Sequence, residues 1–328
     1  MPSRFKDFLG NRNIVQRFLR AVGENRLASA AILAGPEGVG KKTFALLAAQ
    51  YLNCYSPQQE DSCGTCVSCL KIASGIHPDV RLIEPEGLQI KIEQTREVSS
   101  DVQFRPFEGK RKVYVFDQAE KLNEAAANSL LKTLEEPPGY AWIVLVTAHP
   151  DALLATIRSR CPVYRFAPVP AEDIEQLLKQ QGIDPTRARS RARLSRGSVG
   201  GALSQDWEQL ERDREQGLHL LRQLAEVRAF HGVHDFWTKL TPDEQKREKV
   251  QALLNLLLVL LHDVFLVKEG QASNSANTDI IPRLEEVVTL YSFDRICELE
   301  AQLRAALREI QRNVNAQILV ESLYYERR

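Results

Sequence analysis

The sequence predicts an α/β protein, with a mostly parallel sheet covered by helices on both faces, then a small helical domain and an all-α C-terminal domain. Three observations predict this fold class. A glycine-rich loop stands between an apolar strand and a helix near residue 40. Strand and helix patterns alternate through the first half, and helical spacing of apolar residues dominates from Trp207 onward. These patterns place the domains at residues 1–166, 167–205 and 206–328.

The first half contains the alternating elements of a sheet covered on both faces. The expected helices are Asn13–Asn25, Lys41–Leu52, Ile92–Val102 and Glu120–Glu135. The expected strands are Ala28–Ala34, Val80–Ile83, Lys112–Phe116 and Trp142–Val146. Strands that alternate with helices in this way favour parallel pairing, because each helix carries the chain back to the start of the next strand.

The second half is expected to be helical throughout. Residues 171–204 contain short helical patterns interrupted at Gly182, Asp184-Pro185 and Gly197–Gly201. From Trp207 the pattern is helical except for a polar loop at 270–279. The last expected helices are Phe293–Arg312 and Ala316–Tyr325.

Charge and hydropathy exclude some classes of function. Lysine plus arginine number 43 and aspartate plus glutamate also number 43, so the chain is not one that coats nucleic acid by charge alone. The start of the chain has no apolar signal segment. The apolar stretch Leu253–Val267 is interrupted by Asn255, His262 and Asp263, which favours a buried helix over a membrane span. We therefore expect a cytoplasmic protein that does not contact membrane.

Residues 35–43 form a phosphate loop with one part displaced. In the pattern G-x-x-x-x-G-K-[ST], backbone N–H groups and the lysine bind phosphates, and the next hydroxyl binds Mg²⁺. Gly35, Gly40 and Lys41 match this pattern, but Lys42 stands at the hydroxyl position. Thr43 follows one residue late, which on a helix is a rotation of roughly 100°. The loop is therefore expected to retain its shape and to lack an ordinary metal site.

A second nucleotide-site feature is Asp117, at the end of the expected strand Lys112–Phe116. An aspartate in this place commonly contacts Mg²⁺, and the residue after it often polarises the attacking water. The next residue here is Gln118, whose amide cannot accept a proton, and Glu120 is displaced from that position. Alone, the aspartate is equally consistent with an ordinary strand end.

Four of the six cysteines fall within sixteen residues and predict a structural zinc site. Cys54, Cys63, Cys66 and Cys69 have the spacing C-x8-C-x2-C-x2-C, and four thiolates complete a tetrahedral zinc site. The alternative is a group of ordinary buried or free cysteines. Asp61 and His77 are weaker ligand candidates and are expected to face solvent.

The tripeptide Ser159-Arg160-Cys161 is the last candidate. An arginine at a subunit boundary can neutralise charge that develops on a neighbour's phosphates. By itself the tripeptide has no specificity, and a surface salt bridge is the default interpretation.

Together these segments resemble the clamp-loader branch of the AAA+ ATPases. The matching segments are Phe5–Asn11, Gly35–Lys41, the four clustered cysteines, His77–Asp79, Asp117–Leu122, Ala125–Pro138, Ile157–Cys161 and, more loosely, Asn313–Asn315. The resemblance implies an AAA+ phosphate-loop domain with an inserted zinc module at 54–69, a lid, and a C-terminal collar for oligomerisation. It also implies that Arg160 acts in trans as an arginine finger on an adjacent ATPase subunit.

Within this branch the chain is similar to the stationary, non-motor subunits of the bacterial DNA polymerase III clamp loader. That resemblance implies motor (gamma/tau-type) and delta-type partners in a hetero-oligomeric ring, and a sliding clamp and primed DNA reached through the complex. It places the chain in the polymerase III holoenzyme at the nucleoid-associated replisome, without ATPase activity of its own.

Three departures from the motor pattern favour the non-motor role. They are Lys42, Gln118 and the sequence Val199-Gly200-Gly201 after Gly197-Ser198, where motor subunits carry a phosphate-sensing arginine. Thr147 stands near another phosphate-sensing position or is simply a strand-end threonine. The alternatives are an ATP-hydrolysing motor-type subunit or a related DNA-remodelling AAA+ ATPase; a nucleotide kinase fits the helical C-terminal third poorly. Nucleotide binding without hydrolysis stays open, because Gly35, Gly40 and Lys41 are present.

Overall fold

The computed structural model describes residues 3–204, 206–225 and 243–311, and the chain divides into two compact units. The first unit comprises residues 1–177 and 195–203, and the second comprises 178–194 and the chain from 204 onward. The expected lid, 167–205, contributes to both units, and the division into three domains stays a prediction. The expected helix Ala316–Tyr325 and the segment Asn313–Asn315 lie outside the described residues.

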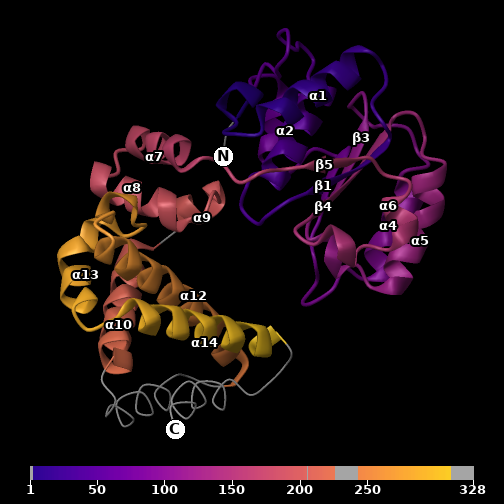
Figure 1. The fold of residues 1–328 in the computed structure, drawn as a ribbon. Coiled ribbons are helices and arrows are strands. Elements are labelled where there is room, and N and C mark those ends of the chain that lie inside the picture. The colour runs from indigo at the N-terminus through magenta and orange to yellow at the C-terminus, as the bar shows by residue number, and fades with distance from the viewer. Residues whose placement is uncertain (1–2, 205, 226–242, 312–328) are drawn as a thin grey trace. The chain divides into compact units, whose positions relative to one another are not determined.

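The first unit is built on a five-stranded parallel sheet with the order β2-β3-β4-β1-β5 (Figure 1). Its strands are β1 (Ala30–Ala34), β2 (Val80–Ile83), β3 (Lys112–Phe116), β4 (Ala141–Thr147) and β5 (Val163–Arg165). The four expected strands are confirmed with small changes at their ends. The edge strand β5 was not expected, because three residues are too short to give a clear period-2 pattern.

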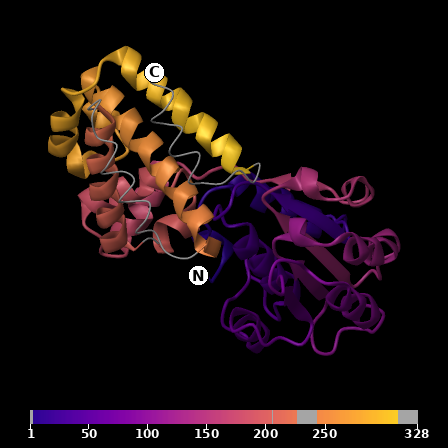
Figure 2. The same ribbon diagram turned by 90° about the horizontal axis from the view of Figure 1, so that it is seen from below.

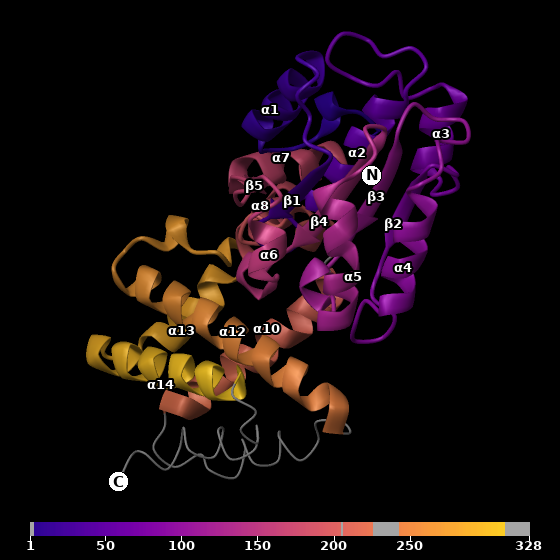
Figure 3. The ribbon, with the colours of Figure 1, turned by 90° about the vertical axis from the view of Figure 1, so that its right-hand side faces the viewer.

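Helices cover both faces of this sheet, as the alternation of side chains along each strand requires. On one face, Ala31 and Leu33 of β1 pack in a core with α1 (Arg12–Gly23) and α2 (Lys41–Asn53). On the other face, Ile32 packs in a second core with helices α4 (Ile92–Asp101), α5 (Glu124–Glu135) and α6 (Ala155–Arg158). Figure 1 and Figure 3 show these layers on opposite sides of the strands. The predicted α/β class is confirmed.

The remaining helices and the short 3₁₀ helices of the described residues follow in chain order. The other helices of the first unit and of the lid region are α3 (Val67–Ala73), α4 (Ile92–Asp101), α5 (Glu124–Glu135), α6 (Ala155–Arg158), α7 (Ala171–Gln180), α8 (Pro185–Leu194) and α9 (Val199–Ser204). The 3₁₀ helices are Phe5–Asp7, Ala119–Lys121, Pro150–Ala152, Ala272–Asn274 and Thr278–Ile280. The short helices expected over 171–204 are confirmed.

The second unit is a helical bundle, visible in orange and yellow in Figure 2. Besides α8, its described helices are α10 (Trp207–Ala225), α12 (Asp243–Lys268), α13 (Ile281–Val288) and α14 (Phe293–Gln311). Leucines of α10, α12, α13 and α14 share one buried core. Within the described residues, one segment, Lys249–Lys268 of α12, is long and apolar enough to cross a membrane by length and composition. In the bundle, Leu254 and Leu261 of this segment are buried in the shared core, and buried Asp263 accepts hydrogen bonds from Asn277.

A buried carboxylate holds the loop that leads into β3. Asp79 is 3% exposed, and its oxygens accept hydrogen bonds from the backbone N–H groups of Phe107, Glu108 and Gly109 at 2.7, 2.9 and 2.7 Å. Removing the carboxylate would leave three buried or half-buried backbone donors without their acceptor.

We expect Asp79→Ala to lower the free energy of unfolding by about 2–4 kcal/mol, because unsatisfied buried donors retain their desolvation cost. Denaturant unfolding followed by circular dichroism measures this. The matched control is Asp151→Ala, whose side chain is 93% exposed, and which is expected to change the value by less than about 0.5 kcal/mol. Equal effects of the two substitutions would contradict the role assigned to Asp79.

Candidate functional site

The phosphate loop and Asp117 lie at the same edge of the parallel sheet. The loop begins at Gly35, directly after β1, and Asp117 directly follows β3. Glu84 directly follows the neighbouring strand β2, and the register Ile83↔Phe116 places Glu84 level with Asp117. The carboxyl edge of an open parallel sheet is where α/β proteins bind ligands.

Lys41 is directed into its own loop. Its Nζ donates to the carbonyl oxygens of Gly35 and Pro36 at 2.6 Å each, and the residue is 7% exposed. Burial lowers the pKa of Lys41, although the nearby carboxylates of Glu120 and Glu37 oppose that shift. Gly40, at φ +97°, is the N-cap of α2 and turns the loop into this helix.

Lys42, and not a hydroxyl, occupies the space beside Asp117. Its Nζ lies 2.5 Å from Glu84 Oε1 and 3.2 Å from Asp117 Oδ2. Burial acts to lower the pKa of Lys42, but the hydrogen bond to Glu84 and the charge of Asp117 outweigh it and raise the pKa. Thr43, one position along α2, is half-buried. Sequence reasoning missed Glu84, which can be found only as the residue that follows the strand next to β3.

An amide side chain, and not a carboxylate, directly follows Asp117. Gln118 is exposed and adopts a left-handed backbone, and its N–H donates to Asp117 Oδ1 at 3.1 Å. Glu120 has one carboxylate oxygen that is buried without a hydrogen-bond partner. The hydroxyl of Thr147 accepts from the backbone N–H of His149 at 3.0 Å, so a local bond already engages it.

The segment 197–201, which was expected to lack a phosphate-sensing arginine, lies directly on the phosphate loop. Gly200 N–H donates to the carbonyl oxygen of Gly38 at 2.9 Å. A Cβ on Gly38 would lie 1.9 Å from the hydroxyl of Ser198. The left-handed backbone of Gly38 (φ +71°) and the close Ser198 side chain both favour glycine at this position. Arg196, before the Gly-Ser pair, is exposed. Sequence reasoning predicted the missing arginine but not this contact.

Arg160 lies at the opposite edge of the sheet from the phosphate loop. It follows α6 and precedes the first residue of β5, Val163, whereas the loop follows the last residue of β1. Val163 lies level with Ile32, three residues before Gly35, which corresponds to roughly 10 Å along the strand direction, and Arg160 comes before Val163. The Arg160 guanidinium is exposed and bonds to Glu135 Oε1 at 2.6 Å and to the Thr156 carbonyl at 2.8 Å. The following residue, Cys161, is buried, which raises its pKa to about 11.

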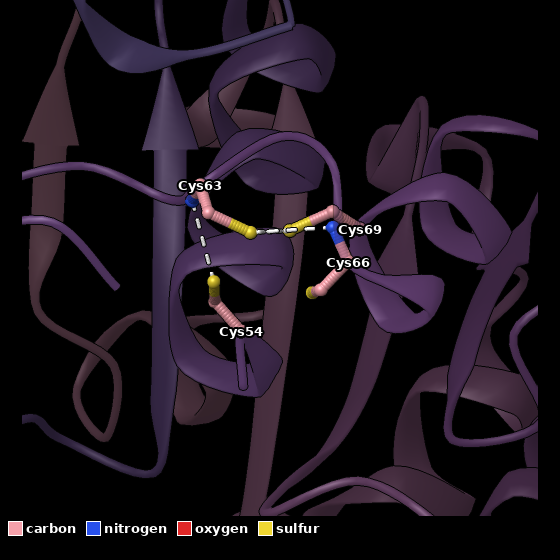
Figure 4. Close-up of side chains that lie close together, drawn as sticks. All are labelled: Cys54, Cys63, Cys66 and Cys69. Carbon is pink, nitrogen blue, oxygen red and sulfur yellow. Dashed lines mark hydrogen bonds between the residues drawn. The ribbon is translucent and has the colours of Figure 1, made fainter. Parts of the chain in front are cut away.

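The four clustered cysteines converge on one point (Figure 4). Cys54 ends α2, Cys63 lies in the following loop, and Cys66 and Cys69 belong to the start of α3. Their sulfur atoms all lie within 4.8 Å of one another, and the Sγ atoms of Cys63 and Cys69 are 4.0 Å apart. Tetrahedral zinc with Zn–S bonds of about 2.3 Å places its sulfurs about 3.8 Å apart. The thiols are therefore close enough to ligate one tetrahedral ion.

Backbone donors around the sulfurs favour thiolates. Hydrogen bonds from the N–H groups of Thr65 and Cys66 lower the pKa of Cys63 to about 6, and Cys63 N–H donates to Cys54 Sγ at 3.3 Å. Burial raises the pKa of Cys54 and of Cys69. A cation among the sulfurs would offset the cost of the buried thiolates, as metal–thiolate sites require.

The two weaker ligand candidates have other roles, and the expectation that they face solvent is wrong. Asp61 is half-buried, and its carboxylate accepts from the backbone N–H groups of Phe5 and Lys6. His77 is 3% exposed, with Nδ1 accepting from Asp79 N–H and Nε2 lying 3.2 Å from the Ser68 hydroxyl. Burial lowers the pKa of His77, which favours the neutral ring.

Comparisons with known proteins identify relatives along almost the whole chain. The family model described as "DNA polymerase III, delta subunit" matches residues 10–170, and the model of the C-terminal part of that subunit matches residues 218–326. The chain is 28% identical to DNA polymerase III subunit delta′ of Bacillus subtilis over 94% of both chains. It is 30% identical to subunit delta′ of Escherichia coli over 87% of this chain and 84% of that one.

The chain is also similar to a tau subunit over a shorter range. It is 34% identical to DNA polymerase III subunit tau of Escherichia coli over 62% of this chain, but only 32% of the tau chain is covered. The similarity to delta′ therefore extends over the helical unit, whereas the similarity to tau covers about a third of that protein.

The contact between residues 197–201 and the phosphate loop can be tested with a pair of glycines. Gly38 and Gly75 have φ angles of +71° and +72°, but a Cβ on Gly75 would meet no atom within 4 Å. Each alanine substitution is expected to lower the free energy of unfolding by about 1–2 kcal/mol, because the left-handed backbone is unfavourable for a residue with a Cβ. We expect Gly38→Ala in addition to displace Ser198 and to expose the Gly200 amide to exchange.

Hydrogen–deuterium exchange followed by mass spectrometry of the peptide that spans residues 197–204 measures this displacement. The expected result is faster exchange in Gly38→Ala and unchanged exchange in Gly75→Ala. Unchanged exchange in both variants would contradict the contact.

Proposed function

Since the chain belongs to the delta-prime family of DNA polymerase III subunits, we propose that it is a non-motor subunit of a clamp loader that presents Arg160 to a neighbouring ATPase subunit. In this role it assembles with motor (gamma/tau-type) and delta-type subunits in a hetero-oligomeric ring. The assembled complex loads a sliding clamp onto primed DNA. The chain acts in the cytoplasm at the nucleoid-associated replisome.

The observation that carries this proposal is the place of Arg160 on the sheet. Because Arg160 lies at the amino edge and the phosphate loop at the carboxyl edge, the guanidinium is far from the chain's own phosphate site. Its exposure and its ion pair with Glu135 hold a positive charge at the surface in a defined orientation. A neighbour's phosphates are the kind of group that such an arginine stabilises when charge develops on them.

Three features of the carboxyl edge support the non-motor role. Lys42 occupies the space beside Asp117, Gln118 follows Asp117 without a carboxylate, and Val199-Gly200-Gly201 after the Gly-Ser pair contains no arginine. These features disfavour the alternative of an ATP-hydrolysing motor-type subunit. A steady-state ATPase assay on the isolated chain separates the two roles, since turnover that Lys41→Ala abolishes would support the motor.

The cysteine cluster is proposed to hold one structural zinc ion. Cys54, Cys63, Cys66 and Cys69 supply four thiolates, and none of the four positions is left for substrate, so the ion has no catalytic role. Bound zinc would join the end of α2 to α3 and to the loop between them, a segment of few large apolar residues. The bound ion would therefore stabilise the fold of this segment.

We expect Arg160→Ala to leave the chain folded and able to assemble, and to slow DNA-stimulated ATP hydrolysis by the reconstituted complex. An arginine finger raises kcat at the site it serves by a factor of about 10³–10⁵. Without it, we expect almost no hydrolysis at that site. The complex then loses the share of turnover that the site contributes. Steady-state hydrolysis with primed DNA and clamp measures the loss.

The control for this experiment lies two residues away. Arg158 also forms an exposed ion pair, with Asp151 at 2.9 Å, and Arg158→Ala is expected to leave hydrolysis unchanged. The variant Arg160→Lys keeps the positive charge but loses the planar guanidinium with its fixed set of donors. We expect ATP hydrolysis by the complex to be slow with this variant as well. Wild-type turnover in a complex assembled with Arg160→Ala would refute the role in trans.

We expect elemental analysis of the purified chain to find about one zinc ion per molecule and Cys69→Ser to lose it. The same substitution should lower the Tm. A decrease of about 2 kcal/mol in the free energy of unfolding corresponds to a decrease in Tm of roughly 4–8 °C for a unit of this size. Cys297→Ser is the control, since Cys297 is exposed on α14 and is expected to keep both zinc and Tm. A zinc-free protein with an intact fold would exclude the zinc assignment.

A further inference from the structure

The side chain of Lys42 occupies the place that a phosphate loop ordinarily reserves for a divalent cation. In that arrangement the residue after the loop lysine binds Mg²⁺ through its hydroxyl, and an aspartate at the end of a nearby strand contacts the same ion. Here the residue after Lys41 is Lys42, and its ammonium lies 3.2 Å from Asp117 at the end of β3. The second carboxylate, Glu84, is 2.5 Å from the same nitrogen.

The positive charge of Lys42 offsets the repulsion between the two carboxylates beside it. Glu84 and Asp117 lie level on adjacent strands, so they would repel each other without a positive charge between them. The ammonium of Lys42 supplies that charge from within the chain, and the side chains of Lys42 and Asp117 are 30% and 16% exposed. A divalent ion added at this place would lie against the ammonium and would be repelled by it.

The rest of the loop is also held by groups of the chain itself. Lys41 donates to the carbonyls of Gly35 and Pro36, and Gly200 N–H donates to the carbonyl of Gly38. These bonds tie both the lysine and the tip of the loop to groups of the chain itself.

We propose that Lys42 is a built-in replacement for the Mg²⁺ of the phosphate loop, and that Glu84 and Asp117 form a latent divalent-cation site that the ammonium closes. Nucleotide binding to the natural chain is then independent of Mg²⁺. A hydroxyl at position 42 reopens the site, because it removes the resident charge and restores the missing ligand beside both carboxylates. This inference concerns the isolated chain and does not depend on the role of Arg160.

The test measures binding of a fluorescent ADP analogue, with and without millimolar Mg²⁺, to the isolated zinc-replete chain. Mg²⁺ is added or omitted without a chelator, so that the metal of the cysteine cluster is not removed. For the natural chain we expect the same affinity, or the same lack of binding, in both conditions. For Lys42→Thr we expect Mg²⁺ to strengthen ADP binding by about tenfold or more, which corresponds to ~1.4 kcal/mol.

Thermal unfolding provides a second readout. We expect Lys42→Thr to have a lower Tm than the natural chain in the absence of Mg²⁺, because Glu84 and Asp117 lose their shared cation. Mg²⁺ with ADP should recover part of that loss by binding only the folded state. The double variant Lys42→Thr with Asp117→Asn is expected to lose the response to Mg²⁺, which assigns the ion to this site.

Two further variants serve as controls. Lys42→Met removes the charge but offers no oxygen ligand, so it should gain little response to Mg²⁺. Lys42→Arg keeps a cation and should behave like the natural chain. If Lys42→Thr does not fold, Lys42→Ser offers the same hydroxyl ligand on a smaller side chain and takes its place in both readouts.

Mg²⁺-strengthened ADP binding by the natural chain or by Lys42→Arg would overturn the proposal. So would a folded Lys42→Thr variant that shows no response to Mg²⁺ by either readout. Loss of the Arg160 effect in the complex would leave these results unchanged, so failure of the proposed function and failure of this inference are distinguishable.

Discussion

All five strands of the sheet run in the same direction, and this shared direction separates the chemistry of the first unit into two edges. Residues that directly follow a strand, such as Gly35, Glu84 and Asp117, gather at the carboxyl edge. A residue that directly precedes a strand, such as Arg160 before β5, is placed at the amino edge. Because the strand direction follows from right-handed crossovers through helices, neither group can move to the other edge without a different fold.

The carboxyl edge retains the shape of a phosphate site while internal groups satisfy its polar atoms. Without a ligand, a concave loop with unpaired carbonyls beside a pair of carboxylates would be unstable. Lys41 bonds two loop carbonyls, Lys42 pairs with both carboxylates, and Gly200 N–H bonds the carbonyl at the tip of the loop. The same lysine charge that satisfies the carboxylates disfavours a metal ion. The charge of Lys42 therefore both stabilises the two carboxylates and makes the site unfavourable for a metal ion.

The sequence predicted the elements better than it predicted their partners. Strands β2 and β3, helix α2 and the cysteine cluster follow from local apolar runs and spacing, which depend on near neighbours. The three-residue strand β5 has too little local pattern, and it forms because β1 offers an open edge. Lys42 and its partner Glu84 are 42 residues apart in the sequence, and Arg160 and its partner Glu135 are 25 residues apart. Only the register of the sheet and the end of α5 bring them close.

An arginine that acts on a neighbour's phosphates is most effective when its position is already fixed, because no reorganisation then opposes the charge it stabilises. In this chain Lys41 and the N–H of Gly200 bond the carbonyl oxygens of the phosphate loop, and Lys42 pairs with the carboxylates beside it. Bonds to Glu135, to the Thr156 carbonyl and to the Ser159 hydroxyl orient the Arg160 guanidinium. In the proposed role, the two edges of the sheet are therefore complementary: Lys42 disfavours a metal ion at this chain's own phosphate loop, and the exposed Arg160 serves the site of a neighbour.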